Sequence, residues 1–151
     1  KSRPETNVLI AGARPHPSIL ALAEKRVKIR GWVEDIRHAY ADGRIFVAPL
    51  FAGSGQQNKI LEALALGRPC LTTPLVNNAI HAEVGQEIEL ADNPASFSQK
   101  ILELLVNPSK RHSLGKAGRS FVEKQYSWRD SVQKLEAWMQ EKMPTSRKES
   151  P

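Results

Sequence analysis

Cysteine is nearly missing from this chain, because Cys70 is the only one among its 151 residues. One cysteine forms no disulfide within the chain, so we expect a reducing, cytoplasmic compartment and a buried, unreactive thiol. Long apolar runs are missing too, since no stretch approaches the roughly 20 residues that cross a bilayer. We therefore expect a protein that at most rests on a membrane surface.

Acidic residues are outnumbered, with 16 Asp and Glu against 22 Lys and Arg, which gives a formal net charge of +6. Such an excess favours anionic partners such as nucleotides, phosphorylated lipids or nucleic acid. The basic residues are scattered, however, and form no aromatic-interleaved face typical of a nucleic-acid binder. Zinc-ligand spacing is also missing between the histidines, which are His16, His38, His81 and His112. We expect no nucleic acid and no bound metal.

Short apolar runs alternate with segments of helical pattern along the chain. The predicted strands are residues 7–11, 27–33, 45–50, 69–73 and 87–90. The predicted helices are residues 18–24, 35–40, 57–66, 78–83, 93–105, 109–124 and 128–142. This alternation predicts βαβ units, and therefore an α/β protein with a Rossmann-like open parallel sheet and helices on both faces.

Polar and glycine residues mark where the predicted helices begin and end. Ser18, Asp35, Asn93 and Ser127 are suited to cap helix starts, and Gly67 is suited to stop the helix at 57–66. Apolar residues make up 40% of the chain, which suffices for one core. We expect one domain over residues 7–142, a flexible start at 1–6 and a disordered tail at 143–151.

A glycine turn directly follows the predicted strand at 45–50. Gly53 and Gly55 let the backbone bend sharply, so that its N–H groups can approach a bulky anion. The helix that follows offers unpaired N–H groups and the positive end of its dipole at the same place. Lys59 in the first helical turn adds an ammonium group. The pattern predicts a phosphate site, although a solvated surface lysine is the alternative reading of Lys59.

Glu62 lies three residues after Lys59 and therefore on the same helical face. A carboxylate in this place is suited to accept hydrogen bonds from the vicinal hydroxyls of a ribose. Because its neighbours are apolar, we expect Glu62 to be partly buried and to need hydrogen-bond partners. The alternative is a surface ion pair between Glu62 and Lys59, which would contribute about 0.2–0.5 kcal/mol.

The ordered set of motifs resembles a known family. In chain order these are V-L-I-A-G, V-K-I-R-G-W-V-E-D, I-F-V-A-P, G-S-G-Q-Q-N-K-I-L-E-A-L-A-L-G-R-P-C-L-T-T, E-I-E-L-A-D-N-P and G-R-S-F-V-E-K-Q-Y-S-W. Across residues 7–140 they resemble the C-terminal, donor-binding domain of GT-B glycosyltransferases of family 4, the group 1 glycosyltransferases. The resemblance implies half of a GT-B fold. The first strand of this half and the N-terminal, acceptor-binding domain are expected to precede Lys1.

The resemblance also implies roles for individual residues, while no catalytic residue is assigned. Glu62 matches the carboxylate that binds the ribose of a nucleoside-diphosphate sugar. The donor-binding turn and helix start match Gly53, Ser54, Gly55, Gln56, Gln57, Asn58 and Lys59. The loop that contacts the base matches Val33, Glu34 and Asp35. The implied reaction is retaining sugar transfer without metal or cofactor, in the synthesis of a polysaccharide or glycolipid.

Two departures from the family pattern bear on activity. Ser54 occupies the position where the family commonly places a glutamate that contacts the transferred sugar. The family's diphosphate-neutralising arginine and lysine are expected before Lys1, since Arg14 comes too late in the order and is expected on a loop surface. We therefore expect weak donor affinity and negligible turnover from this chain alone.

Three other functions stay open at the level of sequence. A non-catalytic nucleotide-binding or regulatory module of flavodoxin-like type would show the same alternation, because a fold does not fix a function. A nucleic-acid binder and a GT-B enzyme of another class, such as a sugar-nucleotide epimerase, are the remaining alternatives. The tryptophans are expected to be packing groups; they are Trp32, Trp128 and Trp138.

Overall fold

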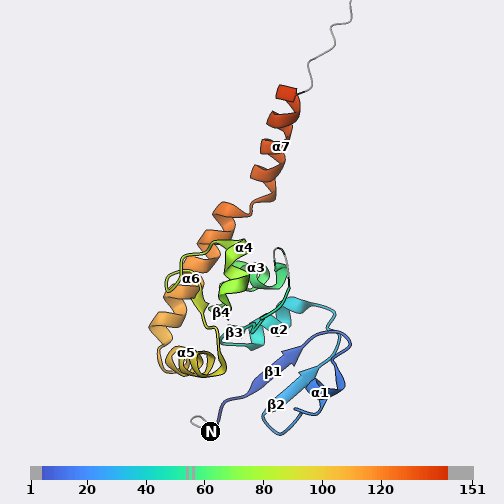
Figure 1. Cartoon of the computed structure of the whole chain (residues 1–151), viewed down its shortest axis with the longest axis vertical. Helices are drawn as coiled ribbons and strands as arrows, with labels where there is room; N and C mark the ends of the chain where they lie inside the picture. Colours follow the sequence, from blue (N-terminus) through green and yellow to red (C-terminus); the bar gives the residue numbers. More distant parts are fainter. Residues whose placement is uncertain (1–4, 54, 56, 143–151) are drawn as a thin grey trace, which may run out of the picture.

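The computed structural model describes residues 5–53, 55 and 57–142. Most of the predicted flexible start, the whole predicted tail, Ser54 and Gln56 lie outside this description. The elements, shown in Figure 1, are β1 (Val8–Ala11), α1 (Pro17–Leu20), β2 (Val27–Arg30), α2 (Ile36–Asp42), β3 (Phe46–Val47), α3 (Asn58–Ala65), β4 (Cys70–Thr72), α4 (Pro74–Ile80), β5 (Glu89–Leu90), α5 (Pro94–Val106), α6 (Pro108–Gln125) and α7 (Trp128–Lys142).

The strands are parallel and form two hydrogen-bonded groups. β1 pairs with β2, and β4 lies between β3 and β5. This arrangement confirms the predicted α/β architecture with parallel strands. Where one continuous sheet was expected, the described strands divide into these two groups, because neither β1 nor β2 pairs with the outer edge of β3.

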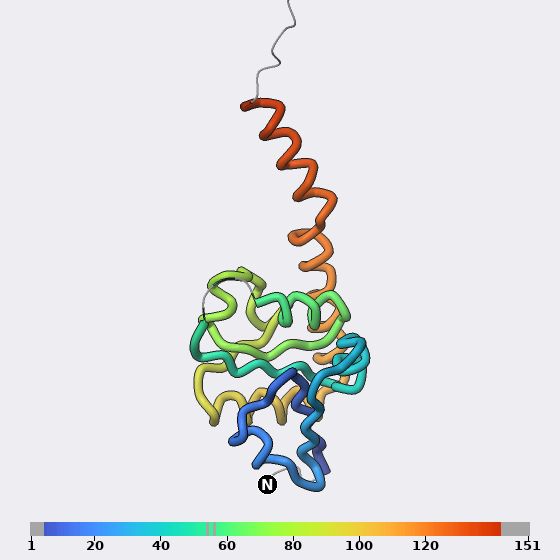
Figure 2. The backbone as a smooth tube through the Cα atoms, turned by 90° about the vertical axis from the view of Figure 1, so that its right-hand side faces the viewer, coloured from blue at the N-terminus to red at the C-terminus, as the bar shows by residue number. Residues whose placement is uncertain are grey.

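Helices cover both faces of β4, as predicted. Cys70 faces the larger core, where it packs with the buried side chains of α3, α4 and α6. Leu71, the next residue, faces a smaller core with Phe97 and Ile101 of α5. Figure 2 shows α3 and α4 on one side of these strands and α5 on the other. Burial raises the pKa of the Cys70 thiol, which agrees with the expected unreactive cysteine.

Most of the predicted helix ends are confirmed. Asp35 caps α2 by accepting a hydrogen bond from the Arg37 N–H at 2.9 Å. Asn93 caps α5, and the Ser127 hydroxyl accepts from the Asp130 N–H at 3.3 Å at the start of α7. Ser18 was predicted wrongly, because the cap of α1 is the His16 ring, which accepts from the Ser18 N–H. Pro17 begins that helix one residue earlier than expected.

The end of α3 follows the predicted glycine stop. Gly67 adopts φ +66°, a conformation that favours glycine. Its N–H donates to the Leu64 carbonyl at 2.8 Å, while the Arg68 N–H donates to the Ala63 carbonyl at 2.9 Å. These two bonds satisfy carbonyl groups that the last helical turn leaves free. The chain therefore turns sharply out of α3 into β4.

A close approach between α3 and α6 depends on a glycine. A Cβ atom at Gly118 would lie 2.6 Å from Leu64 Cδ2 and 2.7 Å from the Glu87 carbonyl oxygen. Both separations are far below ordinary van der Waals contact. Gly118 therefore lets α6 pack directly on α3 and on the chain before β5.

The last helix differs from the rest in its exposure. α7 extends away from the body of the protein and contains no buried residue (Figure 1). Trp128 and Trp138 on α7 are 86% and 57% exposed, and Trp32 after β2 is 75% exposed. The expectation that the tryptophans are packing groups was wrong, because all three are largely exposed. Within the part of the chain that the structure describes, no helix is both long and apolar enough to cross a membrane.

A buried ionic cluster joins β5 to α5 and α6. Glu89 is 1% exposed, and its carboxylate lies 2.8 Å from Lys100 Nζ and 2.6 Å from Lys110 Nζ. Burial favours a raised pKa for Glu89, but the bonds from the two lysines outweigh it and lower the pKa. A buried carboxylate needs such partners, because leaving it unpaired carries a large desolvation cost.

Replacing the Glu89 carboxylate should weaken the fold in a pH-dependent way. At pH 7 we expect Glu89→Gln to lower the free energy of unfolding by about 1.5–3 kcal/mol, the range for hydrogen bonds to charged groups. Because the folded-state pKa of Glu89 is lowered, its stabilisation is present above the unfolded pKa and is lost as the pH falls through the folded one. Urea unfolding from pH 7 to pH 3 measures this difference.

Glu123→Gln is the matched control, because Glu123 is exposed and pairs with Arg119 on the surface. Its effect should stay within about 0.5 kcal/mol at every pH. An equal loss from both variants, or a Glu89→Gln effect that persists unchanged in acid, would contradict the proposed role of the cluster.

Candidate functional site

The candidate site begins where the chain leaves the parallel strands. Thr72 and Thr73, at the carboxyl end of β4, are buried and donate hydrogen bonds to the carbonyls of Ala48 and Leu50. The Thr72 bond measures 2.8 Å. These two bonds fix the segment that leads from β3 into the glycine turn. They hold the turn at the strand edge where ligands bind in open α/β sheets.

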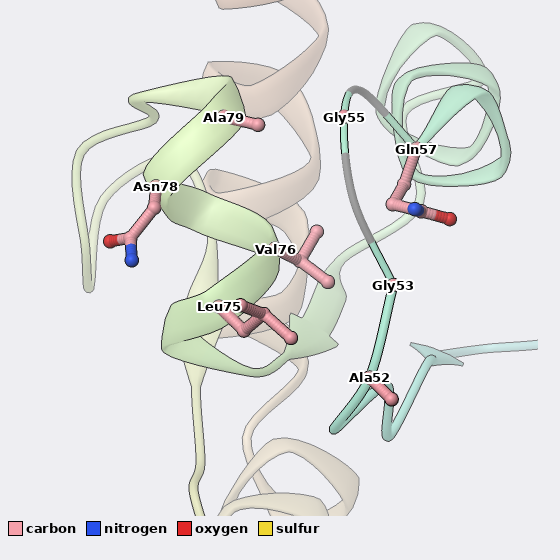
Figure 3. A pocket seen from close by; sticks show the side chains of 8 residues that line it. All are labelled: Ala52, Gly53, Gly55, Gln57, Leu75, Val76, Asn78 and Ala79. Carbon is pink, nitrogen blue, oxygen red and sulfur yellow. The ribbon is translucent and has the colours of Figure 1, made fainter.

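The glycine turn has the backbone conformation that its residues predict. Gly53 has φ +131° and Gly55 has φ +74°, and residues with side chains rarely adopt either value. The turn and α4 line an open cavity of about 220 Å³, with Gly53, Gly55 and Gln57 on one side. Figure 3 shows Val76 of α4 pointing across this cavity towards the turn.

The wall formed by α4 was not predicted, because the helix was expected at residues 78–83. The signal in the sequence is Pro74, since proline is favoured in the first turn of a helix. Thr73 precedes it but provides no side-chain cap, because its hydroxyl donates to the Leu50 carbonyl instead. Leu75 and Val76 therefore lie opposite the glycine turn rather than in a preceding loop.

The start of α3 leaves its first N–H groups without a side-chain cap. Gln57 is the N-cap residue, and its side chain makes no capping hydrogen bond. Asn58 and Lys59 follow and are both exposed. Among the described residues, no ion pair joins Lys59 to Glu62, so the alternative of a surface pair is not realised. The helix start thus combines N–H groups that the Gln57 side chain leaves uncapped with an exposed lysine in the first turn, although Asn58 and Lys59 line neither the cavity at the glycine turn nor a second cavity beside the start of α2.

Glu62 is exposed, contrary to the expected partial burial, but it has a buried partner. The Tyr40 hydroxyl donates to Glu62 Oε2 at 2.9 Å and lies 3.1 Å from the Lys59 carbonyl oxygen. Burial, followed by the hydrogen bond to Glu62, raises the pKa of Tyr40, so the hydroxyl keeps its proton. Sequence reasoning placed Tyr40 only within the predicted helix at 35–40 and missed this bond.

The predicted base loop lines a second cavity, of about 370 Å³. Val33 and Glu34 lie in its wall together with Arg30, Asp35 and His38. The Asp35 carboxylate is engaged in capping α2, and the hydrogen bonds from Arg37 lower its pKa to about 2. The side chain of Glu34 is exposed.

The site is thus divided between two cavities that have no lining residue in common. Glu62 lines neither of them, but its partner Tyr40 comes from α2, which begins at the second cavity. Over residues 5–53, 55 and 57–142, no group of three or more His, Cys, Asp or Glu side chains is arranged to hold a metal ion.

Comparison with known proteins identifies the family. The family model described as "Glycosyl transferases group 1" matches residues 1–107. The chain belongs to this family. A curated relative in this comparison is the GDP-mannose-dependent monoacylated alpha-(1-6)-phosphatidylinositol monomannoside mannosyltransferase of Corynebacterium glutamicum. It is 29% identical over 141 residues, which cover 84% of this chain and 37% of the relative.

Solved glycosyltransferases of the GT-B type share the fold. Sucrose-phosphate synthase from Thermosynechococcus elongatus superposes with a TM-score of 0.79 at 20% identity, over 92% of this chain and 39% of that chain. HepE from Anabaena, solved in complex with UDP and glucose, gives a TM-score of 0.78 at 17% identity, over 90% and 41%. The group 1 glycosyltransferase chain described here therefore spans about two fifths of the length of these proteins.

The backbone of the turn is open to a direct test. Gly53→Ala should destabilise the protein by about 1–3 kcal/mol, because φ +131° is strained for any residue with a side chain. Gly12→Ala is the matched control, since Gly12 has no positive φ and a Cβ there meets no atom within 4 Å. Urea unfolding compares the two variants, and equal small effects would show that the turn does not hold this conformation.

Proposed function

We propose that this chain is the donor-binding part of a glycosyltransferase and binds a nucleoside-diphosphate sugar for retaining transfer of the sugar to an acceptor. The observation that carries the proposal is the continuous path from β3 through the glycine turn into α3, which bears Lys59 and Glu62. Membership of the group 1 family supports the same reading.

The diphosphate is proposed to bind at the glycine turn and the start of α3. The uncapped N–H groups of the first turn and the positive end of the helix dipole favour an anion there. Lys59 adds a positive charge on the same turn. During transfer the leaving diphosphate gains negative charge, and fixed amides and cations stabilise such charge without reorganising. In this proposal no metal ion is required.

The nucleoside is proposed to extend from the turn towards α2. Glu62 keeps Oε1 available for the ribose hydroxyls, because Tyr40 contacts only Oε2. An ionised carboxylate has enough acceptor capacity for both partners. The base would then reach the cavity beside Val33 and Glu34, at the start of α2. In this proposal the glycine turn binds the phosphates, Glu62 the ribose and the loop before α2 the base.

The names of the compared proteins support the class of donor. The Corynebacterium relative is named as GDP-mannose-dependent, and HepE was solved with UDP and glucose. We propose a nucleotide-sugar donor for this chain and an acceptor bound by a part of the protein outside it. Since the Corynebacterium relative is named for a phosphatidylinositol mannoside acceptor, peripheral contact of the full-length protein with a membrane fits the proposal.

We expect this chain to bind the donor without catalysing sugar transfer. Ser54 supplies no charge where the family commonly has a glutamate. The resemblance matches no arginine or lysine of this sequence to the pair that neutralises the donor diphosphate in the family. We therefore propose that the 151-residue chain binds donor weakly and transfers no sugar by itself.

Calorimetric titration with uridine and guanosine diphosphates tests the proposal. One of the two nucleotides should bind, and Glu62→Ala should weaken that binding at least about tenfold, as expected when hydrogen bonds to a charged group are lost. Glu123→Ala is the matched control, because it removes an exposed helical glutamate on α6, away from both cavities. Its affinity should equal that of the wild type.

A different result would favour a different function. Preference for an oligonucleotide over both diphosphates, with affinity falling steeply as salt increases, would indicate nucleic-acid binding. Equal nucleotide affinities of the wild type and Glu62→Ala would show that the Glu62 carboxylate does not contact the nucleotide.

A further inference from the structure

The ring of Tyr40 is fixed in the core, whereas its hydroxyl reaches the candidate site. Tyr40 is 7% exposed, and its ring centroid lies 5.2 Å from that of Phe46 on β3. The ring is tilted by 57° against Phe46, an arrangement that aromatic pairs favour. The hydroxyl at the far end of this fixed ring meets α3 at Lys59 and Glu62. Its position is therefore set by the core and not by the flexible surface.

The Glu62 side chain has few contacts that fix its conformation. Its side chain is exposed, and Tyr40 supplies the one side-chain hydrogen bond recorded for its carboxylate within the described part of the chain. A long exposed side chain samples many rotamers and loses that freedom when it binds a ligand. A partner that fixes the carboxylate before binding reduces this loss.

The Tyr40 hydroxyl also lies between the two halves of the site. It belongs to α2, which begins at the cavity beside Val33 and Glu34, and it contacts α3, which begins at the glycine turn. The hydroxyl donates its single proton to the Glu62 carboxylate, so this bond ties the carboxylate on α3 to α2, while the Lys59 carbonyl oxygen lies 3.1 Å from the same hydroxyl.

We propose that Tyr40 is a positioning residue, which holds the Glu62 carboxylate in the orientation that accepts the ribose hydroxyls of the donor. This inference rests on the function proposed above. It adds that Tyr40 orients the carboxylate that recognises the ribose. Tyr40 acts through Glu62 and does not itself touch the nucleotide. Its loss should therefore affect the ribose hydroxyls and leave the phosphate contacts in place.

The experiment compares a nucleoside diphosphate with its 2′,3′-dideoxy analogue, using whichever of uridine and guanosine diphosphate the wild type binds more tightly. Affinities are measured by NMR titration of the 151-residue chain, which suits weak binding. The wild type should prefer the hydroxylated nucleotide by about tenfold. Tyr40→Phe should reduce this preference by about threefold to tenfold, while affinity for the dideoxy analogue stays within about twofold.

Tyr126→Phe is the matched control. Tyr126 is the other tyrosine of the chain, and its hydroxyl donates to the Ile80 carbonyl at 3.1 Å, on α4. Removing this hydroxyl also deletes one hydrogen bond from a packed ring, but it should leave the ribose preference unchanged. Tyr40→Phe keeps the ring that packs on Phe46, and its amide spectrum checks that the fold is intact. Combining Tyr40→Phe with Glu62→Ala should reduce the preference no further than Glu62→Ala alone.

The outcomes separate the two proposals. If the wild type distinguishes the two nucleotides and Tyr40→Phe does so equally well, the inference on Tyr40 is overturned while the proposed function stands. If Tyr126→Phe reduces the preference for the hydroxylated nucleotide as much as Tyr40→Phe does, loss of either hydroxyl destabilises the fold in general. The inference on Tyr40 is then overturned as well. If the wild type binds neither nucleotide, the proposed function fails and the role of Tyr40 fails with it.

Discussion

The packing of α3 against β4 and α6 is the interaction on which the rest of the site depends. Ile60, Ala63 and Leu64 of α3 have no exposed surface, and Gly118 allows α6 to approach them without a side chain between. Once α3 is held in this way, its first turn lies where the chain arrives from β3. The apolar face of one short helix thus places the polar residues at its start and on its outer face.

The candidate site uses this fixed helix together with two less regular segments. The glycine turn is held by the hydroxyls of Thr72 and Thr73, and the start of α2 by the Asp35 cap. Tyr40 connects the second segment to α3. A ligand that spans phosphates, ribose and base, as proposed above, would contact all three segments.

Local chemistry in the sequence predicted the features that depend on neighbouring residues. Gly67, Asn93 and the turn at Gly53 each have a local requirement, such as a positive φ or a free N–H group, that few residue types meet. The bond from Tyr40 to Glu62 joins residues 22 positions apart and leaves no periodic signal. The exposed Trp128 shows the same limit, because an apolar residue in a helix indicates a packing surface without showing whether this chain covers it.

The central claim is that a nucleotide binds along the strand edge from the glycine turn to the start of α2. An NMR titration of the amide signals with uridine and guanosine diphosphates locates that binding residue by residue, even when affinity is weak. The account predicts that signals of Gly53, Gly55 and Lys59 shift together with those of Val33 and Glu34, while signals of α7 stay unchanged. Shifts confined to α7 or scattered over the basic surface would contradict it.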